Sequence, residues 1–99
     1  MRTRQSKPFS RLKPKLRPGV RFRPETQGAI IFDSATMGIY ATNRTGLLIL
    51  NKLDGRTSCG KIVERLQRHF GSPSKRTLRN DLRRFLEDLV SVRLLSLEL

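Results

Sequence analysis

The spacing of apolar residues changes along this chain, and between residues 20 and 42 it is typical of strands. Residues 20–23 alternate apolar and charged side chains, residues 28–33 are rich in β-branched and aromatic side chains, and a short Ser-Ala-Thr turn leads into residues 37–42. Runs of this length and composition favour strands over helices. The sequence therefore predicts three strands, the last two of which pair as an antiparallel hairpin.

A first helix is predicted after residue 43, where apolar residues recur every three or four positions. Asn43 is a suitable N-cap because its side-chain oxygen can accept hydrogen bonds from the free amides of the first turn. Asp54-Gly55 should end this helix, since glycine tolerates the left-handed conformation of a C-terminal cap. The apolar face would comprise Gly46, Leu47, Leu48, Ile49, Leu50 and Leu53.

A second helix follows after a very short connection. Thr57 or Ser58 is expected to be its N-cap, and Gly71 should end it. Its apolar stripe contains Cys59, Ile62, Val63, Leu66 and Phe70. Two consecutive apolar stripes separated by Asp-Gly and Thr-Ser predict a chain reversal between two packed helices.

The third predicted helix opens at Ser72-Pro73, with Ser72 as N-cap and Pro73 at the first helical position. Its buried face would contain Leu78, Leu82, Phe85 and Leu89, and a half-basic, half-apolar flank beside that face would contain Arg79, Arg83, Leu86 and Val90. For residues 93–99, RLLSLEL, both a final helical turn and a β segment remain open. The sequence thus predicts an α+β domain, with three N-terminal antiparallel strands followed by three helices.

Charge is concentrated ahead of this domain. The chain carries 21 basic and 8 acidic residues, a formal net charge of +13, and residues 1–24 hold nine of the basic residues and no acidic one. Residues 1–17 combine this charge with prolines and few large apolar side chains, so we expect a basic, flexible N-terminal arm followed by a domain over residues 18–99. The excess charge suggests an anionic partner such as nucleic acid, membrane lipid or an acidic peptide.

Few residues are placed for catalysis. Cys59 and His69 are the only residues of their types, which leaves no disulfide and no Cys/His zinc site within one chain. Cys59 falls on an apolar stripe and should be buried, whereas His69 should lie at the surface near the end of the second helix. We expect no enzyme activity, no cofactor and no metal site. A lone cysteine and the lack of a long apolar run favour a soluble, cytoplasmic protein.

Two binding functions fit the pattern. In a winged helix-turn-helix regulator, an exposed surface of the third helix would contact DNA through Lys75, Arg76, Arg79, Arg83 and Arg84. Against this, the strands precede the helices, whereas a wing hairpin usually follows the recognition helix. In a peptide-binding domain, an extended chain would add to the edge of the strand over residues 37–42, which has few of the charges that protect an edge.

The order of several motifs resembles the PqqD-like family, peptide chaperones also called RiPP precursor-peptide recognition elements. These motifs are Asn43-Arg44-Thr45-Gly46, Ile49-Leu50, Leu53-Asp54-Gly55, Thr57 or Ser58, Ile62-Val63 with Leu66, Phe85-Leu86 with Leu89, and Leu94-Leu95. The resemblance spans about residues 16–97. Lys61 stands where an acid commonly precedes the Ile-Val pair, and Arg93 where a glycine often precedes the final Leu-Leu.

The resemblance implies a function without catalysis. Such a domain binds the leader segment of a ribosomally synthesised precursor peptide and presents it to a maturation enzyme, such as a radical S-adenosylmethionine (SAM) enzyme or a lasso-peptide leader protease. The leader would dock as an added strand on Met37, Gly38, Ile39, Tyr40 and Ala41. By the same resemblance, Arg79, Arg83, Leu86 and Val90 would form the facing wall, with the two arginines attracting acidic leader residues.

Overall fold

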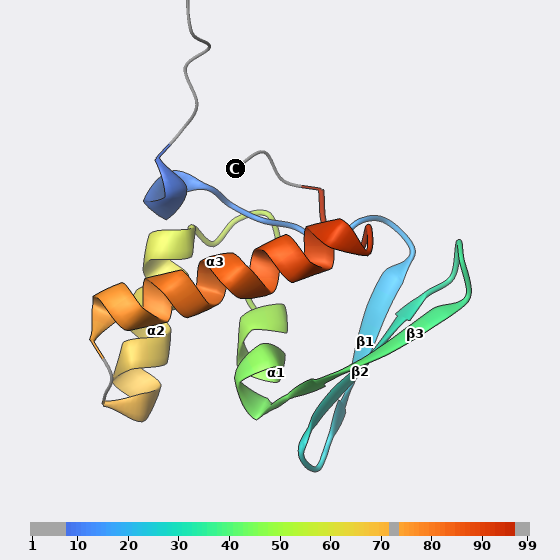
Figure 1. Ribbon diagram of the computed structural model, residues 1–99, viewed down its shortest axis with the longest axis horizontal. Helices are drawn as coiled ribbons and strands as arrows, with labels where there is room; N and C mark the ends of the chain where they lie inside the picture. Colours follow the sequence, from blue (N-terminus) through green and yellow to red (C-terminus); the bar gives the residue numbers. More distant parts are fainter. Residues whose placement is uncertain (1–7, 72–73, 97–99) are drawn as a thin grey trace, which may run out of the picture.

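The computed structural model of the chain describes residues 8–71 and 74–96. After a 3-10 turn, η1 (Phe9–Arg11), come the strands β1 (Val20–Glu25), β2 (Gly28–Asp33) and β3 (Gly38–Asn43). The helices α1 (Arg44–Leu50), α2 (Cys59–Phe70) and α3 (Lys75–Ser91) follow (Figure 1). The predicted fold class, three antiparallel strands followed by three helices, is confirmed.

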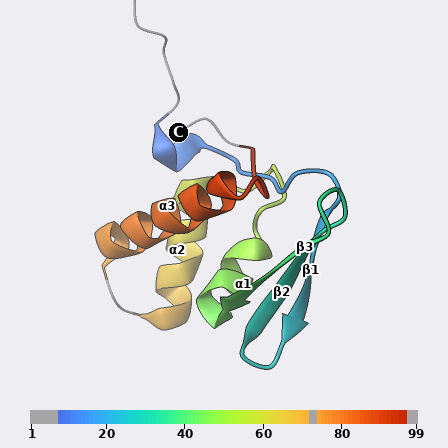
Figure 2. The same cartoon turned by 45° about the vertical axis from the view of Figure 1, so that its right-hand side comes forward.

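The strands form an antiparallel sheet in the order β1-β2-β3, so β1 and β3 are its edges. Phe22, Ile31 and Tyr40 are cross-strand neighbours and lie on the face that packs against the helices. Arg21, Phe32 and Ile39 are neighbours in the next row and therefore lie on the opposite face. All three helices lie on one side of the sheet, as two views show (Figures 1 and 2).

Met37, predicted to begin the third strand, lies instead in the turn before it. The Asp33 carboxylate accepts hydrogen bonds from the Ala35 amide at 3.0 Å and the Thr36 hydroxyl at 3.2 Å, and the Met37 amide donates to the Asp33 carbonyl at 2.7 Å. Met37 adopts a φ of 63° to close this turn. The apolar Met37 side chain is consequently held at the hairpin tip, 69% exposed.

The helix boundaries agree with the predicted caps in part. Asn43 caps α1, Ser58 caps α2, and Gly71, with a φ of 75°, ends α2, all as expected. However, α1 ends at Leu50 rather than at Asp54-Gly55, and Asp54 organises the next loop by accepting from the amides of Arg56 and Thr57. The predicted start of α3 at Ser72-Pro73 lies outside the described residues, and Ser74 is the N-cap.

The buried face of α3 also differs from the prediction by one position. Leu86 is 0% exposed and belongs to the core, whereas Phe85 is only partly buried. Leu78, Leu82 and Leu89 complete the buried stripe as expected. After α3, Leu94 and Leu95 are buried, and Leu95 forms an isolated antiparallel bridge with Leu16. Of the segment left open in the prediction, residues 97–99 lie outside the described residues.

Residues 8–17, expected to belong to a flexible arm, lie against the domain. Phe9, Leu12 and Leu16 pack on the core, and Pro14 is fully buried. Backbone hydrogen bonds attach this segment, including one from the Cys59 amide to the Leu12 carbonyl at 2.7 Å. Sequence composition missed this packing because the surface that the segment covers is assembled from distant parts of the chain. The other part of the expected arm, residues 1–7, lies outside the described residues.

Candidate functional site

The edge of β3 is the first element of the candidate site. Among the described residues β3 pairs only with β2, so its outer backbone groups have no strand partner. An unpaired edge of this kind can take an additional strand. Inward-facing and outward-facing side chains alternate along β3, with Tyr40 and Thr42 half-buried and Ile39 and Ala41 exposed.

A groove of about 340 Å³ separates this edge from α3. Tyr40 and Thr42 line it from β3, Phe85 and Asp88 from α3, and Val92 from the C-cap of α3. We call these five residues the β3 groove. Val92 is 40% exposed and Phe85 is half-buried, so apolar surface is accessible here. The groove therefore offers unpaired backbone on one wall and apolar side chains with one carboxylate on the other.

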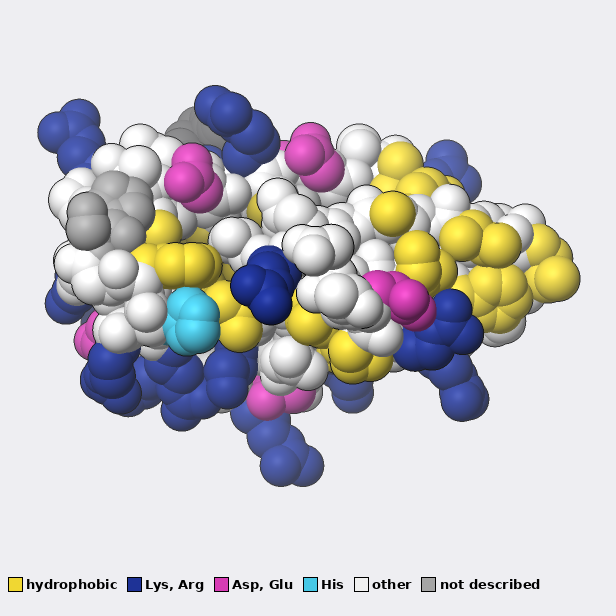
Figure 3. All heavy atoms as spheres, turned by 90° about the horizontal axis from the view of Figure 1, so that it is seen from below, with side chains coloured by type: hydrophobic (Ala, Val, Ile, Leu, Met, Phe, Trp, Pro, Cys, Tyr) yellow, Lys and Arg dark blue, Asp and Glu magenta, His cyan; other side chains and the backbone are white. Residues whose placement is uncertain are grey.

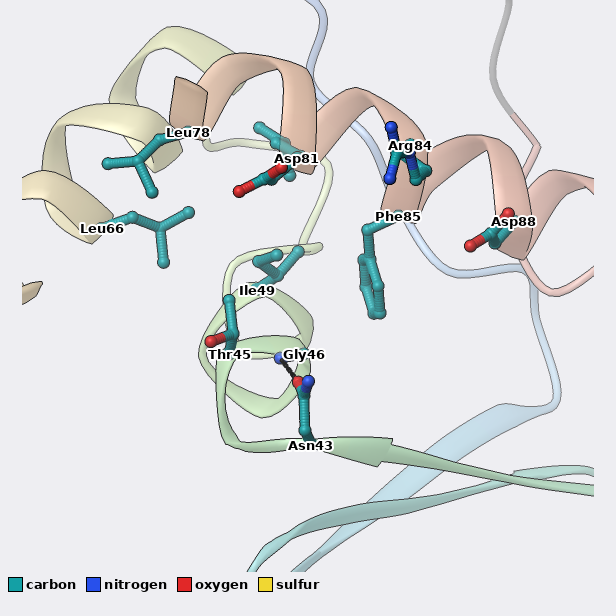
Figure 4. Close-up of a pocket in the computed structure, with 11 residues that line it drawn as sticks. Asn43, Thr45, Gly46, Ile49, Leu66, Leu78, Asp81, Arg84, Phe85 and Asp88 are labelled. Atoms are coloured by element: carbon teal, nitrogen blue, oxygen red, sulfur yellow. Dashed lines mark hydrogen bonds between the residues drawn. The ribbon is translucent and has the colours of Figure 1, made fainter. Parts of the chain in front are cut away.

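The groove continues toward the start of α1. A neighbouring cavity of about 310 Å³ shares Phe85 and Asp88 with the β3 groove and adds Asn43, Thr45, Gly46, Asp81 and Arg84, among others. In the close-up, Phe85 points from α3 toward the junction of β3 and α1, and Asp81 and Asp88 lie on either side of it along the helix (Figure 4). One channel thus runs along α3 from Val92 to Asp81.

Local sequence shapes the junction of β3 and α1. The Asn43 side chain accepts a hydrogen bond from the Gly46 amide at 2.9 Å, which starts α1 directly after the last residue of β3 (Figure 4). Gly46 is required here for a close approach, since a Cβ atom at this position would collide with the Thr42 hydroxyl. The abrupt change from strand to helix keeps α1 at the end of the β3 edge and leaves the length of the edge uncovered.

The charge of the groove is opposite to that of the whole chain. Asp81 and Asp88 line it, and neither forms an ion pair with a basic side chain of the described residues, where the ion pairs are Arg23–Glu25 and Lys61–Glu64. Arg84 is the basic residue that lines the same channel. A cationic group brought into the channel along α3 would therefore meet two unpaired carboxylates, of which Asp88 lies in the β3 groove.

Several residues of the predicted wall lie elsewhere. The Arg83 guanidinium carbon lies 4.3 Å from the centre of the Phe9 ring, and Arg79 lines a different cavity with Phe9 and Cys59. By helical spacing Val90 shares this side of α3. We call Arg79, Arg83 and Val90 the covered flank, because Phe9 packs against this side at Arg83, although the Arg79 side chain itself stays exposed. The expectation that Arg79 and Arg83 face β3 is wrong, since they lie across α3 from the groove.

The predicted place of Leu86 in the facing wall also needs correction. Leu86 has no exposed surface, so its side chain cannot contact a docked peptide directly. The residues of α3 that do face the groove are Asp81, Phe85, Asp88 and Val92, which we call the open flank. Their spacing of three or four residues was visible in the sequence. The missing signal was the position of Leu86 in the buried stripe, which turns Phe85 toward the groove.

Cys59 and His69 lie apart from the groove. Cys59 is 0% exposed, as expected, and burial raises the pKa of its thiol to about 11. His69 is exposed and packs edge-to-face with Phe70, with ring centres 4.8 Å apart. Across residues 8–71 and 74–96, no cluster of His, Cys, Asp and Glu is arranged to hold a metal ion. No helix in these ranges is long and apolar enough to span a membrane.

The family model for coenzyme PQQ synthesis protein D (PqqD) matches residues 28–95, from β2 to the bridge after α3. The chain belongs to the PqqD family. This match confirms the resemblance, and the matched range contains all five residues of the β3 groove. No curated protein matches it.

A solved structure with a similar fold is described as TbiB1 in complex with the TbiA(beta) leader peptide. The two chains are 21% identical and superpose with a TM-score of 0.77 over 86% of this chain and 98% of that chain. At this identity the likeness is one of fold.

Proposed function

We propose that this PqqD-family chain binds the leader segment of a ribosomally synthesised precursor peptide as an added strand on β3. The observation that carries the proposal is the unpaired β3 edge lying along an apolar groove. The fold similarity to TbiB1, whose structure holds a leader peptide, is consistent with it. The leader would pair with Gly38, Ile39, Tyr40 and Ala41, and Met37 at the hairpin tip would meet the leader where it leaves the edge.

Backbone pairing and side-chain contacts have separate tasks in this arrangement. Main-chain hydrogen bonds supply affinity without regard to leader sequence, and the side chains that alternate along the added strand supply selectivity. One row of leader side chains would enter the groove between Tyr40 and the open flank. Apolar side chains would contact Phe85 and Val92, and a basic side chain beside them would approach Asp88. This charge preference replaces the acidic leader expected from Arg79 and Arg83.

The consequence of leader binding is a raised local concentration. A precursor held by its leader keeps its core segment tethered close to a maturation enzyme that binds the same chain. We propose no catalytic step for the chain itself. A radical SAM enzyme and a leader protease are both partners for which this presentation suffices. We place this work in the cytoplasm, where precursor peptides are made and where the buried thiol of Cys59 would stay reduced.

Strand addition can be tested with a backbone-modified peptide. Overlapping peptides that tile the short open reading frames beside the gene would be screened for binding, and the best binder would then be N-methylated at one amide at a time. Only every second amide of an added strand points toward its partner. We therefore expect affinity to fall at alternate positions, with amide shifts in the protein centred on β3. A loss of affinity without this two-residue period would reject strand addition.

A titration of the same protein with duplex DNA distinguishes peptide binding from the DNA-binding regulator hypothesis. Lys75, Arg76, Arg79 and Arg84 are exposed on α3, so weak, salt-sensitive binding of any polyanion is expected. Duplex DNA at physiological salt should bind far more weakly than the best peptide. Tight DNA binding that does not compete with the peptide would favour the regulator.

A further inference from the structure

The face of the sheet that points away from the helices carries an apolar patch. Ile39 is 67% exposed, and its cross-strand neighbour Phe32 and the nearby Ile30 are only partly buried. None of these three residues packs on the core, in contrast to Ile31 and Tyr40 on the other face. We call Ile30, Phe32 and Ile39, together with Arg21 and Arg23, the outer sheet face.

The outer sheet face is hollowed rather than flat. A depression of about 320 Å³ is lined by Phe22 and by the five residues of the outer sheet face. Its floor is apolar and its β1 side is basic. Seen from below, hydrophobic side chains gather over the sheet end of the molecule, with Lys and Arg side chains beside them (Figure 3). The depression has room for a large apolar side chain from another molecule.

The charges beside the depression indicate which kind of partner could bind there. Arg21 forms no ion pair with an acidic side chain of the described residues, and Arg23 is held by Glu25 at 2.7 Å. A partner that presents a carboxylate next to an apolar side chain would match both features. A second copy of this chain matches poorly, because each copy carries a formal net charge of +13 and its own basic strand.

The size of the face indicates how long a contact would last. Three strands of six residues cover an area of roughly 10 by 20 Å, on the order of 200 Å². A stable interface buries about 800 Å² on each partner. The outer sheet face by itself therefore fits a short-lived contact better than a permanent dimer.

We propose that the outer sheet face docks the maturation enzyme, through an apolar side chain flanked by carboxylates on the enzyme's surface. This site is separate from the leader site, since the leader would occupy the edge of β3 and the enzyme the face of the same sheet. Ile39 belongs to β3 and brings the two sites next to each other. An enzyme bound there is adjacent to the peptide without competing for the β3 edge.

The test uses the full chain and the purified candidate enzyme encoded beside its gene, without leader peptide. Arg21→Glu reverses the charge of an exposed side chain, and Phe32→Thr removes the aromatic ring from the floor while placing a residue with high strand propensity there. We expect each change to weaken enzyme binding about ten-fold or more. Arg65→Glu on the exposed side of α2 is the matched charge control and should change enzyme affinity less than about two-fold.

Leader affinity measured on the same variants separates the two proposals. It should stay within about two-fold for Arg21→Glu and Phe32→Thr, because neither residue lies in the β3 groove. If the enzyme does not bind, or if both variants bind it as the unaltered chain does, the docking site is refuted whatever the leader does. A dimer in light scattering that Phe32→Thr dissociates would assign the face to a second copy and would also overturn the proposal.

Discussion

The two flanks of α3 both mix apolar and charged side chains, but their charges are opposite and their surroundings differ. The covered flank, Arg79, Arg83 and Val90, lies on the side where Phe9 packs under the Arg83 guanidinium. The open flank, Asp81, Phe85, Asp88 and Val92, faces the unpaired edge of β3. The mixture of apolar and charged residues does not by itself show which of the two flanks is accessible. The flank available to a ligand is determined by which side the rest of the chain leaves uncovered.

The charge of the open flank is also opposite to the net charge of the chain. A chain with a net charge of +13 was expected to attract acidic peptides through arginines of α3. Its two predicted arginines lie on the covered flank, and the open flank presents two carboxylates. Local charge at a binding groove can therefore oppose the charge of the whole molecule, and at contact distances the local charge has the larger effect on binding.

The largest expected effect is on stability, at the covered flank. Replacing both Phe9 and Leu12 with Ala removes two partly buried apolar side chains that pack on the core, and burial of each contributes about 1.5 kcal/mol. We expect the free energy of unfolding, measured with urea, to fall by about 3 kcal/mol. Val92→Ala on the open flank is the control, and it should cost less than about 1 kcal/mol because Val92 is partly exposed. Equal losses would mean that residues 8–17 do not hold the covered flank.

The next effect is on leader affinity, at the open flank. Phe85→Ala removes the largest apolar side chain of the groove wall and should weaken leader binding about 10- to 100-fold, as loss of a central aromatic anchor does. Arg83→Glu on the covered flank should leave the affinity within about two-fold. Circular dichroism would confirm that both variants are folded at the assay temperature. If Arg83→Glu weakens binding more than Phe85→Ala, the two flanks have been assigned the wrong way round.

A smaller effect should follow from charge. Asp88→Lys should weaken binding of leader peptides with a basic residue in the paired segment by about three- to ten-fold, since attraction becomes repulsion. Arg79→Glu, a charge reversal on the covered flank, should have little effect on the same peptides. Isothermal titration at low and high salt would show the difference shrinking as salt screens it. A gain in affinity with Asp88→Lys would show that the leader is acidic after all.

The smallest effect concerns Cys59 and is absent at neutral pH. Burial raises the pKa of this thiol from 9.0 to about 11 in the folded chain. Above pH 9 the unfolded chain loses this proton and the folded chain keeps it, so stability should decline between pH 9 and 11 and be unaffected by this group below pH 9. Urea unfolding across this range should show a steeper decline for the unaltered chain than for Cys59→Ala. Parallel pH profiles would mean that the thiol is not buried.

Local features of the sequence predicted most of the fold. Asn43 and Gly71 cap helices in the structure, as their residue types predict. A cap depends mainly on its own residue and on the backbone groups next to it. The antiparallel strands followed from short apolar runs. The end of α1 was predicted at Asp54, but in the structure the helix ends earlier and Asp54 accepts hydrogen bonds from the next loop, a role that residue type leaves open.

The candidate site was predicted on one wall and missed on the other. The β3 edge was predicted because residues 37–42 have few of the charges that protect an edge strand and because the family resemblance places the leader there. The α3 wall was missed for a different reason. Helical periodicity gives the angles between side chains around an axis, but it does not say which way the helix is turned toward a sheet elsewhere in the sequence.

The sequence by itself determined the elements of this protein, their caps, their order and the apolar edge strand, because each depends on residues within a few positions of one another. Only the tertiary structure decided that Leu86 is buried, that Phe85 and Asp88 face β3, and that residues 8–17 cover Arg83. These outcomes depend on surfaces that exist only when segments far apart in the chain have packed together. A short segment with few apolar residues can then be ordered by a surface that its own composition does not indicate.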